Sequence, residues 1–462
     1  MSASSGPGMR RLPCLVHDLP VAGDAVPRML ALHAARPDRY PVLLESAASG
    51  APLGRYSLLL AAVAERLVLD AAGQLSGPGQ GERFCDRLND WWRGLRSDPP
   101  PAGWPFAGGW FLYLGYELAA EVEPTLSIPA SPLPIVALAW RTPAALVHDH
   151  QTGRTAVLGE PGAQAAVEAL LADLAAPPAP VCPAARGLDR AVVEEDPARY
   201  LEACQLALGH IAAGDVYQAN LARSWRAPLP AGVAPASLYA NLRIANPGAF
   251  AGIAQLDGLA ILSSSPERLV RVQGRRIDTR PIAGTRPRQA TADPIAIAAL
   301  TGSPKERAEH VMLIDLERND LGRICEPGTV QVDEFMVVES YAHVHHIVSN
   351  VSGRLRAEIE PGAVIRALFP GGTITGCPKV RCMQLIGALE GVGRGAYTGA
   401  MGYLGLDGSL DLNILIRTMT IHRGEIEWRA GAGIVADSDP ASELEETRAK
   451  ALGMLRAFGR AA

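Results

Sequence analysis

Short apolar runs separated by glycine, serine and proline turns recur along the chain and predict a protein rich in β-strands. Between Tyr40 and Leu60, two apolar runs flank a Gly/Ser/Pro turn, as in a β-hairpin. Residues 104–117 are rich in glycine and aromatic side chains, and residues 135–158 are typical of strands joined by an Asp-His-Gln-Thr-Gly turn. Further strand-like runs occupy residues 259–265, 268–273, 275–282 and 329–351.

Longer segments carry apolar residues at helical spacing. The stretch 200–213 is one of them and ends at Gly214, and the stretch 379–392 is another that stops near Gly391. Strands and helices are mixed without a strict βαβ alternation, so the pattern favours an α+β fold with large, mostly antiparallel sheets. The remaining predicted helices cover residues 163–176, 306–325 and 441–458, the last with its start at Ser438 or Asp439 before Pro440.

Clustered prolines at residues 177–187 make this segment the best candidate for a linker, because proline disrupts both helices and central strands. They predict an N-terminal region, 1–187 including the linker, and a C-terminal domain, 188–462. A chain of 462 residues that is 48% apolar and 20% charged can bury a large core without disulfides or a structural metal.

Charge and targeting signals narrow the class of protein. A net charge of −5 argues against a nucleic-acid partner, which would favour a basic patch. No apolar run reaches the length of about 18 residues that spans a bilayer, and the N-terminus lacks the apolar segment of a signal peptide. Seven cysteines without a Cys-x-x-Cys pair indicate reduced thiols. We therefore expect a cytoplasmic protein without a membrane or nucleic-acid partner.

A glycine-rich loop at residues 369–379, FPGGTITGCPK, is similar to a phosphate loop only in part. Cys377 and Pro378 stand where a nucleotide-binding loop requires lysine and then serine or threonine. The helix that follows from Lys379 offers free N–H groups and suits a ligand that carries a carboxylate. The plain alternative is a glycine turn that starts a helix.

Three glutamates are candidates for chemistry. Glu309 lies on a largely apolar helix face, so its carboxylate needs a partner such as a base or a metal, and Mg²⁺ prefers oxygen ligands. Glu446 and Lys450 are four residues apart, although such a pair is often only a surface ion pair. Glu267 follows a Ser-Pro turn, where a turn or cap residue is the alternative. Further oxygen ligands near Glu309 are Asp315, Glu317 and Asp320.

Histidines cluster in one predicted strand. His343 and His345 share one face of this strand, and His346 lies on the other. A zinc site would need a third histidine or cysteine nearby, and the sequence has none at the usual spacing. A single imidazole that works as a general acid or base is at least as well supported.

Eight motifs, taken together and in order, are similar to those of the chorismate-binding enzymes, a family that includes anthranilate synthase component I and aminodeoxychorismate synthase component I. The resemblance is near-continuous from residue 197 to residue 457 and looser before it. It implies an anthranilate synthase component I-like fold, a sandwich of large sheets flanked by helices. The motifs are SPER, TRPIAGTRPR, AEHVMLIDLERNDLGR, HHIVS, FPGGTITGCPK, RGAYTGAMGYL, NILIRT and AGAGIVADS with EETRAK.

The resemblance also implies roles for single residues. Glu309 and Glu446 match the two ligands of a Mg²⁺ ion that holds the ring carboxylate of chorismate. Glu267 matches the general acid that protonates the departing C4 hydroxyl. The residues that match positions beside the ring are Thr373 and His346, and those that match substrate contacts are Tyr397, Arg417, the backbone of Gly433 and Lys450.

A segment near the N-terminus resembles the tryptophan site of the same family. It comprises Leu44, Glu45 and Ser46, and the site it resembles binds tryptophan as a regulator or as a structural element. A plain hairpin in the N-terminal sheet is the alternative.

The expected reaction is amination of chorismate to 4-amino-4-deoxychorismate, on the path to para-aminobenzoate and folate. FPGGTITG and VHH are similar to enzymes that make this product. Ala283, however, stands where such enzymes often carry a lysine nucleophile, and alanine is typical of anthranilate synthase, so anthranilate plus pyruvate is the alternative. Isochorismate formation and a non-catalytic relative are less supported. We expect a separate glutamine amidotransferase subunit to supply the ammonia and a separate lyase to release pyruvate.

Overall fold

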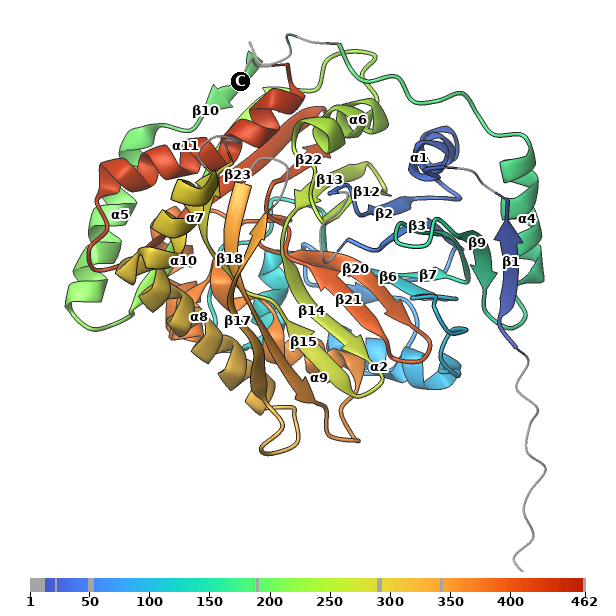
Figure 1. Ribbon diagram of the computed structural model, residues 1–462, viewed down its shortest axis with the longest axis horizontal. Coiled ribbons are helices and arrows are strands. Elements are labelled where there is room, and N and C mark those ends of the chain that lie inside the picture. The colour runs from blue at the N-terminus through green and yellow to red at the C-terminus, as the bar shows by residue number, and fades with distance from the viewer. Residues whose placement is uncertain are drawn as a thin grey trace, which may run out of the picture.

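Two large β-sheets dominate the computed structural model, which describes residues 13–20, 23–48, 54–185, 187, 191–288, 293–340 and 344–459 (Figure 1). One sheet has 12 strands and the other 11, and neighbouring strands pair antiparallel. Helices lie around both sheets. The predicted α+β fold with large antiparallel sheets in a sandwich is confirmed.

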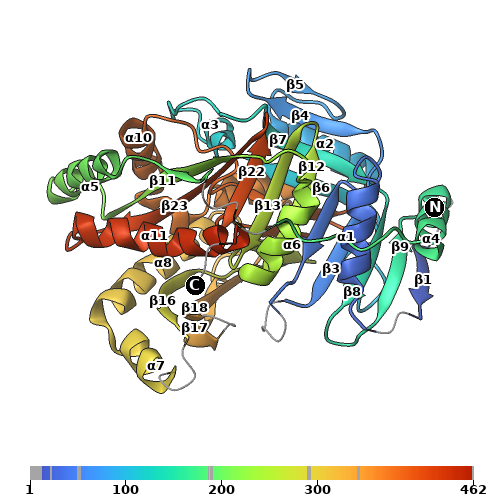
Figure 2. The same ribbon diagram turned by 90° about the horizontal axis from the view of Figure 1, so that it is seen from above.

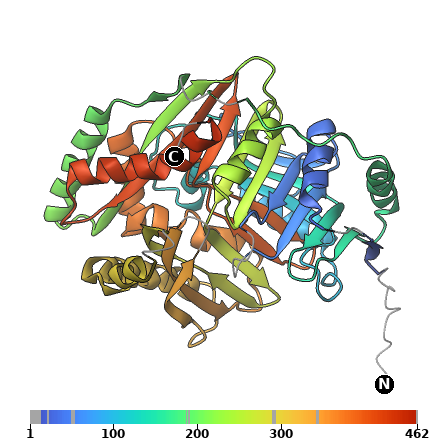
Figure 3. The same cartoon turned by 45° about the horizontal axis from the view of Figure 1, so that its top comes forward.

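The first sheet joins strands from the two ends of the chain. Strand β2, from the predicted hairpin, pairs with β12, so that Leu44 lies opposite Gly252. Figure 3 shows this junction, where the blue N-terminal strands meet the yellow-green ones. The order is β1 (Leu15–Leu19), β9 (Thr155–Gly159), β8 (Ala144–Asp149), β3 (Tyr56–Ala61), β2 (Val42–Glu45), β12 (Phe250–Leu256), β13 (Leu259–Ser265), β22 (Thr418–His422), β23 (Glu425–Ile434), β11 (Gln218–Pro228) and β10 (Val193–Glu194), with β19 (Gly376–Cys377) on β11.

The second sheet is built in the same way. Strand β6 pairs with β20, so that Leu112 lies opposite Gly402. Both sheets therefore run without a break across residue 187, and the division of the chain at that residue stays a prediction. The order is β16 (Ile282–Pro287), β18 (Val344–Arg354), β15 (Arg276–Thr279), β14 (Arg268–Gln273), β21 (Leu410–Asn413), β20 (Ala400–Gly405), β6 (Gly109–Leu114), β7 (Ile135–Thr142), β4 (Arg66–Asp70) and β5 (Leu75–Ser76), with β17 (Gln331–Ser340) on β18.

Three apolar layers hold the sandwich together. The inner layer lies between the sheets, where Leu58 and Leu60 of β3 pack with Phe111 and Tyr113 of β6. The outer face of the first sheet is covered by α1 (Val26–Ala35), α4 (Gln164–Ala175), α6 (Pro235–Ala245) and α11 (Pro440–Ala457), as Figure 2 shows from above. The outer face of the second sheet is covered by α2 (Phe84–Leu95), α8 (Pro304–Gly322) and α9 (Pro361–Leu368).

The remaining helices are α5 (Pro197–Ala212), α10 (Lys379–Glu390), α7 (Asp293–Gly302) and the short α3 (Ala119–Val122), with 3₁₀ turns η1 (Tyr116–Leu118) and η3 (Gly372–Ile374). Helix α10 ends at Gly391, whose φ of 65° is the left-handed conformation that glycine adopts readily, as predicted. Asp439 caps α11 by accepting a hydrogen bond of 2.9 Å from the Ser442 N–H. Within the described residues, every helix is too short or too polar to cross a bilayer.

Candidate functional site

Glu267 lies in the connection between β13 and β14, and its side chain is only 5% exposed. Its carboxyl Oε1 accepts a hydrogen bond of 2.8 Å from the Thr373 hydroxyl on η3, and the Ile282 N–H also donates to the carboxyl. Burial and the nearby Glu317 carboxyl raise the pKa of Glu267 to about 8, although these hydrogen bonds and the Lys450 ammonium lower it. Glu267 therefore holds its proton at neutral pH, which a general acid requires.

Lys450 and Glu446 form an ion pair, and Lys450 also makes a hydrogen bond to the first sheet. Lys450 Nζ lies 2.7 Å from Glu446 Oε1 one turn away on α11, and it also donates to the Gly431 carbonyl of β23 at 2.9 Å. The ammonium is near enough to Glu267 to lower the pKa of that carboxyl. Helix α11 thus presents a cation and a carboxylate to the region around Glu267.

Arg417, Tyr397 and His346 extend this region. The half-buried Arg417 has its pKa lowered by burial, against the opposing effect of Tyr397 and Glu446. Its φ of 52° is left-handed, a strained conformation for a non-glycine residue that clusters at functional sites. Burial raises the pKa of Tyr397 to about 12, and burial together with Arg417 lowers the pKa of His346 to about 4. The phenol and the imidazole are therefore neutral at pH 7, and the guanidinium carries the charge.

Glycines in β23 keep the backbone of this region open. A Cβ at Gly433 would lie 2.3 Å from Gln218 Nε2, and one at Gly431 would lie 2.8 Å from the Tyr397 hydroxyl. Either clash would force a shift of neighbouring atoms. Gly433 lies opposite Asn220 of β11 in the sheet. The glycines therefore allow side chains from β11 and Tyr397 to approach the strand closely.

Two residues of β11 that we did not predict from the sequence belong to this site. Gln218 Oε1 and Asn220 Oδ1 are buried, and neither has a hydrogen-bond partner among the described residues. Buried polar atoms usually have a partner, so these two suit a bound ligand that donates hydrogen bonds. Asn220 lies opposite Gly433 of β23, and the Gln218 amide lies beside the same glycine, so the signal comes from the pairing of the strands and was not apparent from β11 alone.

Glu309 lies on a different element. It is half-buried on α8, a helix that packs against β16, β18 and η3, the elements of Ala283, His346 and Thr373. The next residue, His310, anchors α8 through a hydrogen bond of 2.7 Å between its Nε2 and the Ser349 hydroxyl on β18. The helix of Glu309 is thus fixed against the strand of His346.

The other predicted oxygen ligands on α8 have structural partners. Asp315 forms an exposed ion pair with Arg318 at 2.7 Å. Asp320 is buried and pairs with Lys379. Burial and Asp320 raise the pKa of Glu317 to about 7, whereas Lys379 and the Gly372 N–H lower it. Glu317 and Asp320 therefore contact η3 and the chain that follows it, through the Gly372 N–H and the Lys379 ammonium.

Ala283 lies beside the candidate acid. It is buried in β16 opposite Ile347, and the register shifts at Gly284, whose φ is 65°. The preceding residue, Ile282, donates its N–H to the Glu267 carboxyl. Residue 283 is thus next to the contact between β16 and Glu267.

The segment that resembles a tryptophan site is held by α6. Glu45 is 3% exposed, lies 2.5 Å from Arg243 Nη2 and accepts a hydrogen bond of 2.7 Å from the Tyr239 hydroxyl. The Ser46 N–H donates to the Ser57 hydroxyl at 3.2 Å, and Leu44 is half-buried. These contacts give Glu45 a structural role, and tryptophan binding stays a prediction. His343 lies outside the described residues.

A cavity of about 250 Å³ shares one residue, Tyr397, with the predicted site. Arg394 and Arg429 contribute to its lining. Glu267, Glu309, Glu446 and Lys450 do not line it. The lining of this cavity therefore does not include the candidate acid or the candidate metal ligands.

Arg394 fixes the segment that carries Tyr397. The fully buried guanidinium donates to Glu390 Oε1 at 2.5 Å and to the Asn220 carbonyl at 2.7 Å. We expect Arg394→Met to lower the free energy of unfolding by about 3 kcal/mol, because it leaves the buried Glu390 charge without its main partner. Urea denaturation measures the change, and the double variant Arg394→Met, Glu390→Gln should recover part of it. Equal loss in the single and double variants would contradict this explanation.

Comparisons with known proteins match the chain to one family. The family model described as chorismate binding enzyme matches residues 65–456. The chain is 37% identical to an aminodeoxychorismate synthase of Streptomyces griseus over 97% of its own length and 64% of that protein. It is 41% identical to an anthranilate synthase component 1 of Streptomyces coelicolor over 79% of its length and 75% of that protein. The crystal structure of anthranilate synthase component I from Streptococcus pneumoniae superposes with a TM-score of 0.76 at 30% identity, covering 87% of this chain and 92% of that one.

Proposed function

Because the chain belongs to the chorismate-binding enzymes, we propose that it replaces the C4 hydroxyl of chorismate with ammonia to make 4-amino-4-deoxychorismate. The observation that carries the proposal is the buried Glu267, which keeps its proton up to a pH of about 8 and is held by Thr373. Similarity to the Streptomyces griseus aminodeoxychorismate synthase over 97% of the chain supports C4 as the carbon that receives nitrogen. The chain spans 64% of that relative's length. The activity of the longer relative is therefore assigned to this chain as a proposal.

Substrate binding follows from the charges around Glu267. Arg417 and Lys450 supply cations for the carboxylates of chorismate, and the Tyr397 hydroxyl and the Gly433 backbone supply further contacts. The open glycine strand β23 permits the close approach that such backbone contacts need. Chorismate thereby gains charge-assisted hydrogen bonds in a half-buried site, where screening by water is reduced.

The residues present suit Mg²⁺. Glu309 is a half-buried carboxylate, and Glu446 is a half-exposed one whose charge is balanced by Lys450 at 2.7 Å. Carboxylates with room for water and substrate oxygens are the donors that Mg²⁺ prefers, so we propose that Glu309 and Glu446 hold this ion. When bound, it supplies positive charge that holds the ring carboxylate and withdraws electron density from the ring.

Proton transfer is the role of Glu267. Its carboxyl gives a proton to the C4 oxygen as the C4–O bond breaks, and the oxygen leaves as water. The carboxylate that remains is stabilised by the Thr373 hydroxyl, the Ile282 N–H and the nearby Lys450. Ammonia forms the new C4–N bond and returns one proton to the Glu267 carboxylate, so chorismate and ammonia give the amine and water. Because residue 283 is alanine, ammonia attacks without the help of a lysine nucleophile. His346 and Thr373 are the residues that we propose lie beside the ring.

Ammonia needs a source, and we propose a glutamine amidotransferase subunit as the partner. The purified chain should use ammonium directly, and a matching amidotransferase should make glutamine an equal nitrogen donor. Glutamine-dependent turnover by the purified chain alone would contradict a separate source.

The second candidate function is anthranilate synthesis, and one observation favours it. Ala283, buried next to the Glu267 contact, leaves no amine at the position where a lysine would assist amination at C4. Without that amine, ammonia would add at C2 and pyruvate would be eliminated. The anthranilate synthase component 1 of Streptomyces coelicolor is a relative of similar identity.

One incubation separates the two products. The purified chain is mixed with chorismate, Mg²⁺ and ammonium, and the product is identified by mass and fluorescence. We expect 4-amino-4-deoxychorismate, which becomes para-aminobenzoate only after an aminodeoxychorismate lyase is added. Fluorescent anthranilate formed without the lyase would overturn the C4 assignment, and a reaction without the protein is the control for uncatalysed products.

A further inference from the structure

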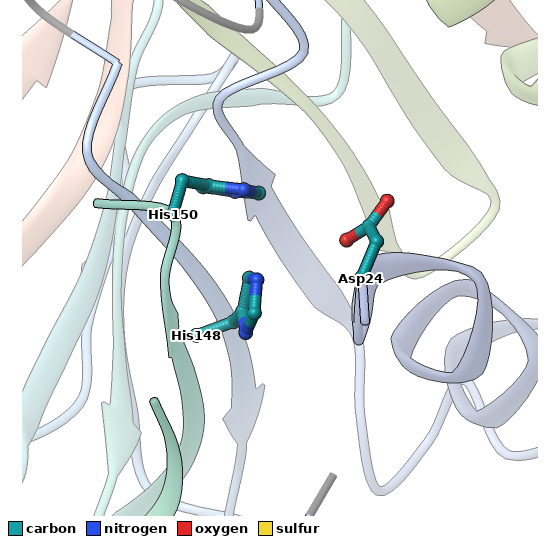
Figure 4. A group of neighbouring side chains, drawn as sticks. All are labelled: Asp24, His148 and His150. Carbon is teal, nitrogen blue, oxygen red and sulfur yellow. The ribbon is translucent and has the colours of Figure 1, made fainter. Parts of the chain in front are cut away.

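Asp24, His148 and His150 form a cluster of metal-binding groups on the first sheet, apart from the residues proposed for chorismate (Figure 4). A carboxylate oxygen of Asp24 and one ring nitrogen of each histidine all lie within 4.8 Å of one another. Asp24 lies two residues before the first residue of α1, His148 lies in β8, and His150 follows that strand. Figure 4 shows the three side chains around one space between β8 and the start of α1.

Strand geometry brings the two histidines together. Residues two apart in a strand point to the same face, so His148 and His150 share a face while Asp149 lies on the other. Asp149 is occupied there by Arg55, which donates to both of its carboxylate oxygens at 3.1 and 2.9 Å. The imidazole rings meet edge to face, with centroids 4.6 Å apart. The backbone at the end of β8 therefore fixes the distance between the His148 and His150 rings.

Hydrogen bonds orient both imidazole rings. His148 Nδ1 lies 2.8 Å from the Thr155 hydroxyl on β9, which leaves Nε2 as its available nitrogen. His150 Nε2 lies 2.8 Å from the Ser57 hydroxyl, which also accepts the Ser46 N–H at 3.2 Å. Histidines that bind metals usually engage their second nitrogen in this way, which fixes the tautomer and the ring orientation.

Charge in the cluster suits a cation. Asp24 supplies a carboxylate beside two imidazole nitrogens, a donor set that transition-metal ions take from proteins. Asp24 is exposed, and its carboxylate has room to approach the two rings from solvent. Metal bonds of about 2.0–2.2 Å need this small movement, because the ligand atoms must come closer together.

We propose that Asp24, His148 and His150 bind one first-row transition-metal ion, with Zn²⁺ as the preferred ion and water in the remaining position. Two nitrogen ligands and one carboxylate suit Zn²⁺ rather than Mg²⁺, which prefers oxygen ligands throughout. The ion would connect the start of α1 to β8 and so fix the first helix that covers this sheet. The proposal is independent of the proposed function, because none of the three residues belongs to the chorismate site.

The test uses the full chain with Cys182→Ser, because Cys182 is an exposed thiol that could bind metal elsewhere. After treatment with a chelator, the protein is titrated with Zn²⁺ by calorimetry and with Co²⁺ by visible absorption. We expect one equivalent bound, Co²⁺ bands without thiolate charge transfer, a melting temperature that rises with Zn²⁺, and no displacement by excess Mg²⁺.

Variants locate the site. His148→Ala, His150→Ala and Asp24→Asn should each weaken Zn²⁺ binding at least tenfold, and Thr155→Val should weaken it by about tenfold because Thr155 only orients His148. His17→Ala, an exposed histidine on β1 of the same sheet, is the matched control and should bind normally. Asp24→Asn keeps the fold because Asn Oδ1 can still accept the Val26 N–H, as Asp24 does at 2.9 Å. Absence of saturable binding, or binding unchanged in Asp24→Asn and His148→Ala, would overturn the proposal.

Discussion

Replacing Glu309 or Glu446 with alanine is expected to abolish Mg²⁺-dependent turnover of chorismate and to leave the fold intact. A bound cation that neutralises developing charge contributes several kcal/mol, which corresponds to a loss of about 1,000-fold in rate. Neither side chain is fully buried, and the substitutions remove no apolar packing. We therefore expect changes in unfolding free energy within about 0.5 kcal/mol.

Neighbouring carboxylates on the same helices provide matched controls. Asp315 on α8 pairs with Arg318 at 2.7 Å, and Glu445 on α11 pairs with Arg448 at 2.6 Å, both exposed. Asp315→Ala and Glu445→Ala should keep full activity at every Mg²⁺ concentration. Steady-state rates across a Mg²⁺ titration and thermal melts of all four variants provide the measurement. Full activity in Glu309→Ala or Glu446→Ala would remove that residue as a metal ligand.

Local chemistry along the chain predicted the helix ends well. Gly391 ends α10 in the left-handed conformation, and Asp439 begins α11 as its cap. Such signals act within a few residues, so they are visible in sequence alone. The fold class was also predicted, because mixed strands and helices without βαβ alternation favour antiparallel sheets.

The partners of each strand and the surroundings of each acid could not be predicted in this way. Apolar patterning identifies β2 and β12 as strands, but it does not indicate that they pair. Glu267 follows a Ser-Pro turn and would pass for a cap residue, yet contacts from η3 and β16 bury it. Gln218 and Asn220 were missed for the same reason, since Asn220 lies opposite Gly433 of β23 and the Gln218 amide lies beside that glycine.

The resemblance to the chorismate-binding enzymes supplied what local signals lacked. It grouped Glu309 with Glu446, and the structure places the first on a helix packed against the strand of His346 and the second beside Lys450. Their roles as Mg²⁺ ligands stay a prediction. Neither kind of signal indicated the cluster of Asp24, His148 and His150, because Asp24 is brought near the histidines by the packing of α1 on β2 and β3, the strands that follow β8 in the sheet.

Glu267→Gln is expected to block loss of the C4 hydroxyl and lower turnover by about 10²- to 10⁴-fold, the usual contribution of a general acid. Glutamine keeps the shape and can accept the Thr373 hydrogen bond, but it has no proton to give. In the native enzyme, turnover should fall as pH rises through about 8, because Glu267 then loses its proton. Thr373→Val removes a hydrogen bond that lowers the pKa of Glu267. In this variant, the fall of turnover at alkaline pH should therefore occur at a higher pH than in the native enzyme. An unchanged rate in Glu267→Gln would remove the residue as the acid.

The same substitution should stabilise the protein at alkaline pH. The pKa of Glu267 is raised from 4.5 to about 8 in the folded state, so between these values the unfolded chain has lost a proton that the native protein retains. Native stability therefore falls as pH rises across this window, and one pKa unit corresponds to about 1.4 kcal/mol. Glu267→Gln carries no such penalty, and we expect it to be more stable than the native chain by on the order of 2–4 kcal/mol at pH 9 and by much less at pH 5. Urea denaturation at both pH values measures the difference. A gain at pH 9 together with lost turnover would show that the buried acid destabilises the fold and serves catalysis, whereas equal stability at both pH values would mean that its pKa is not raised.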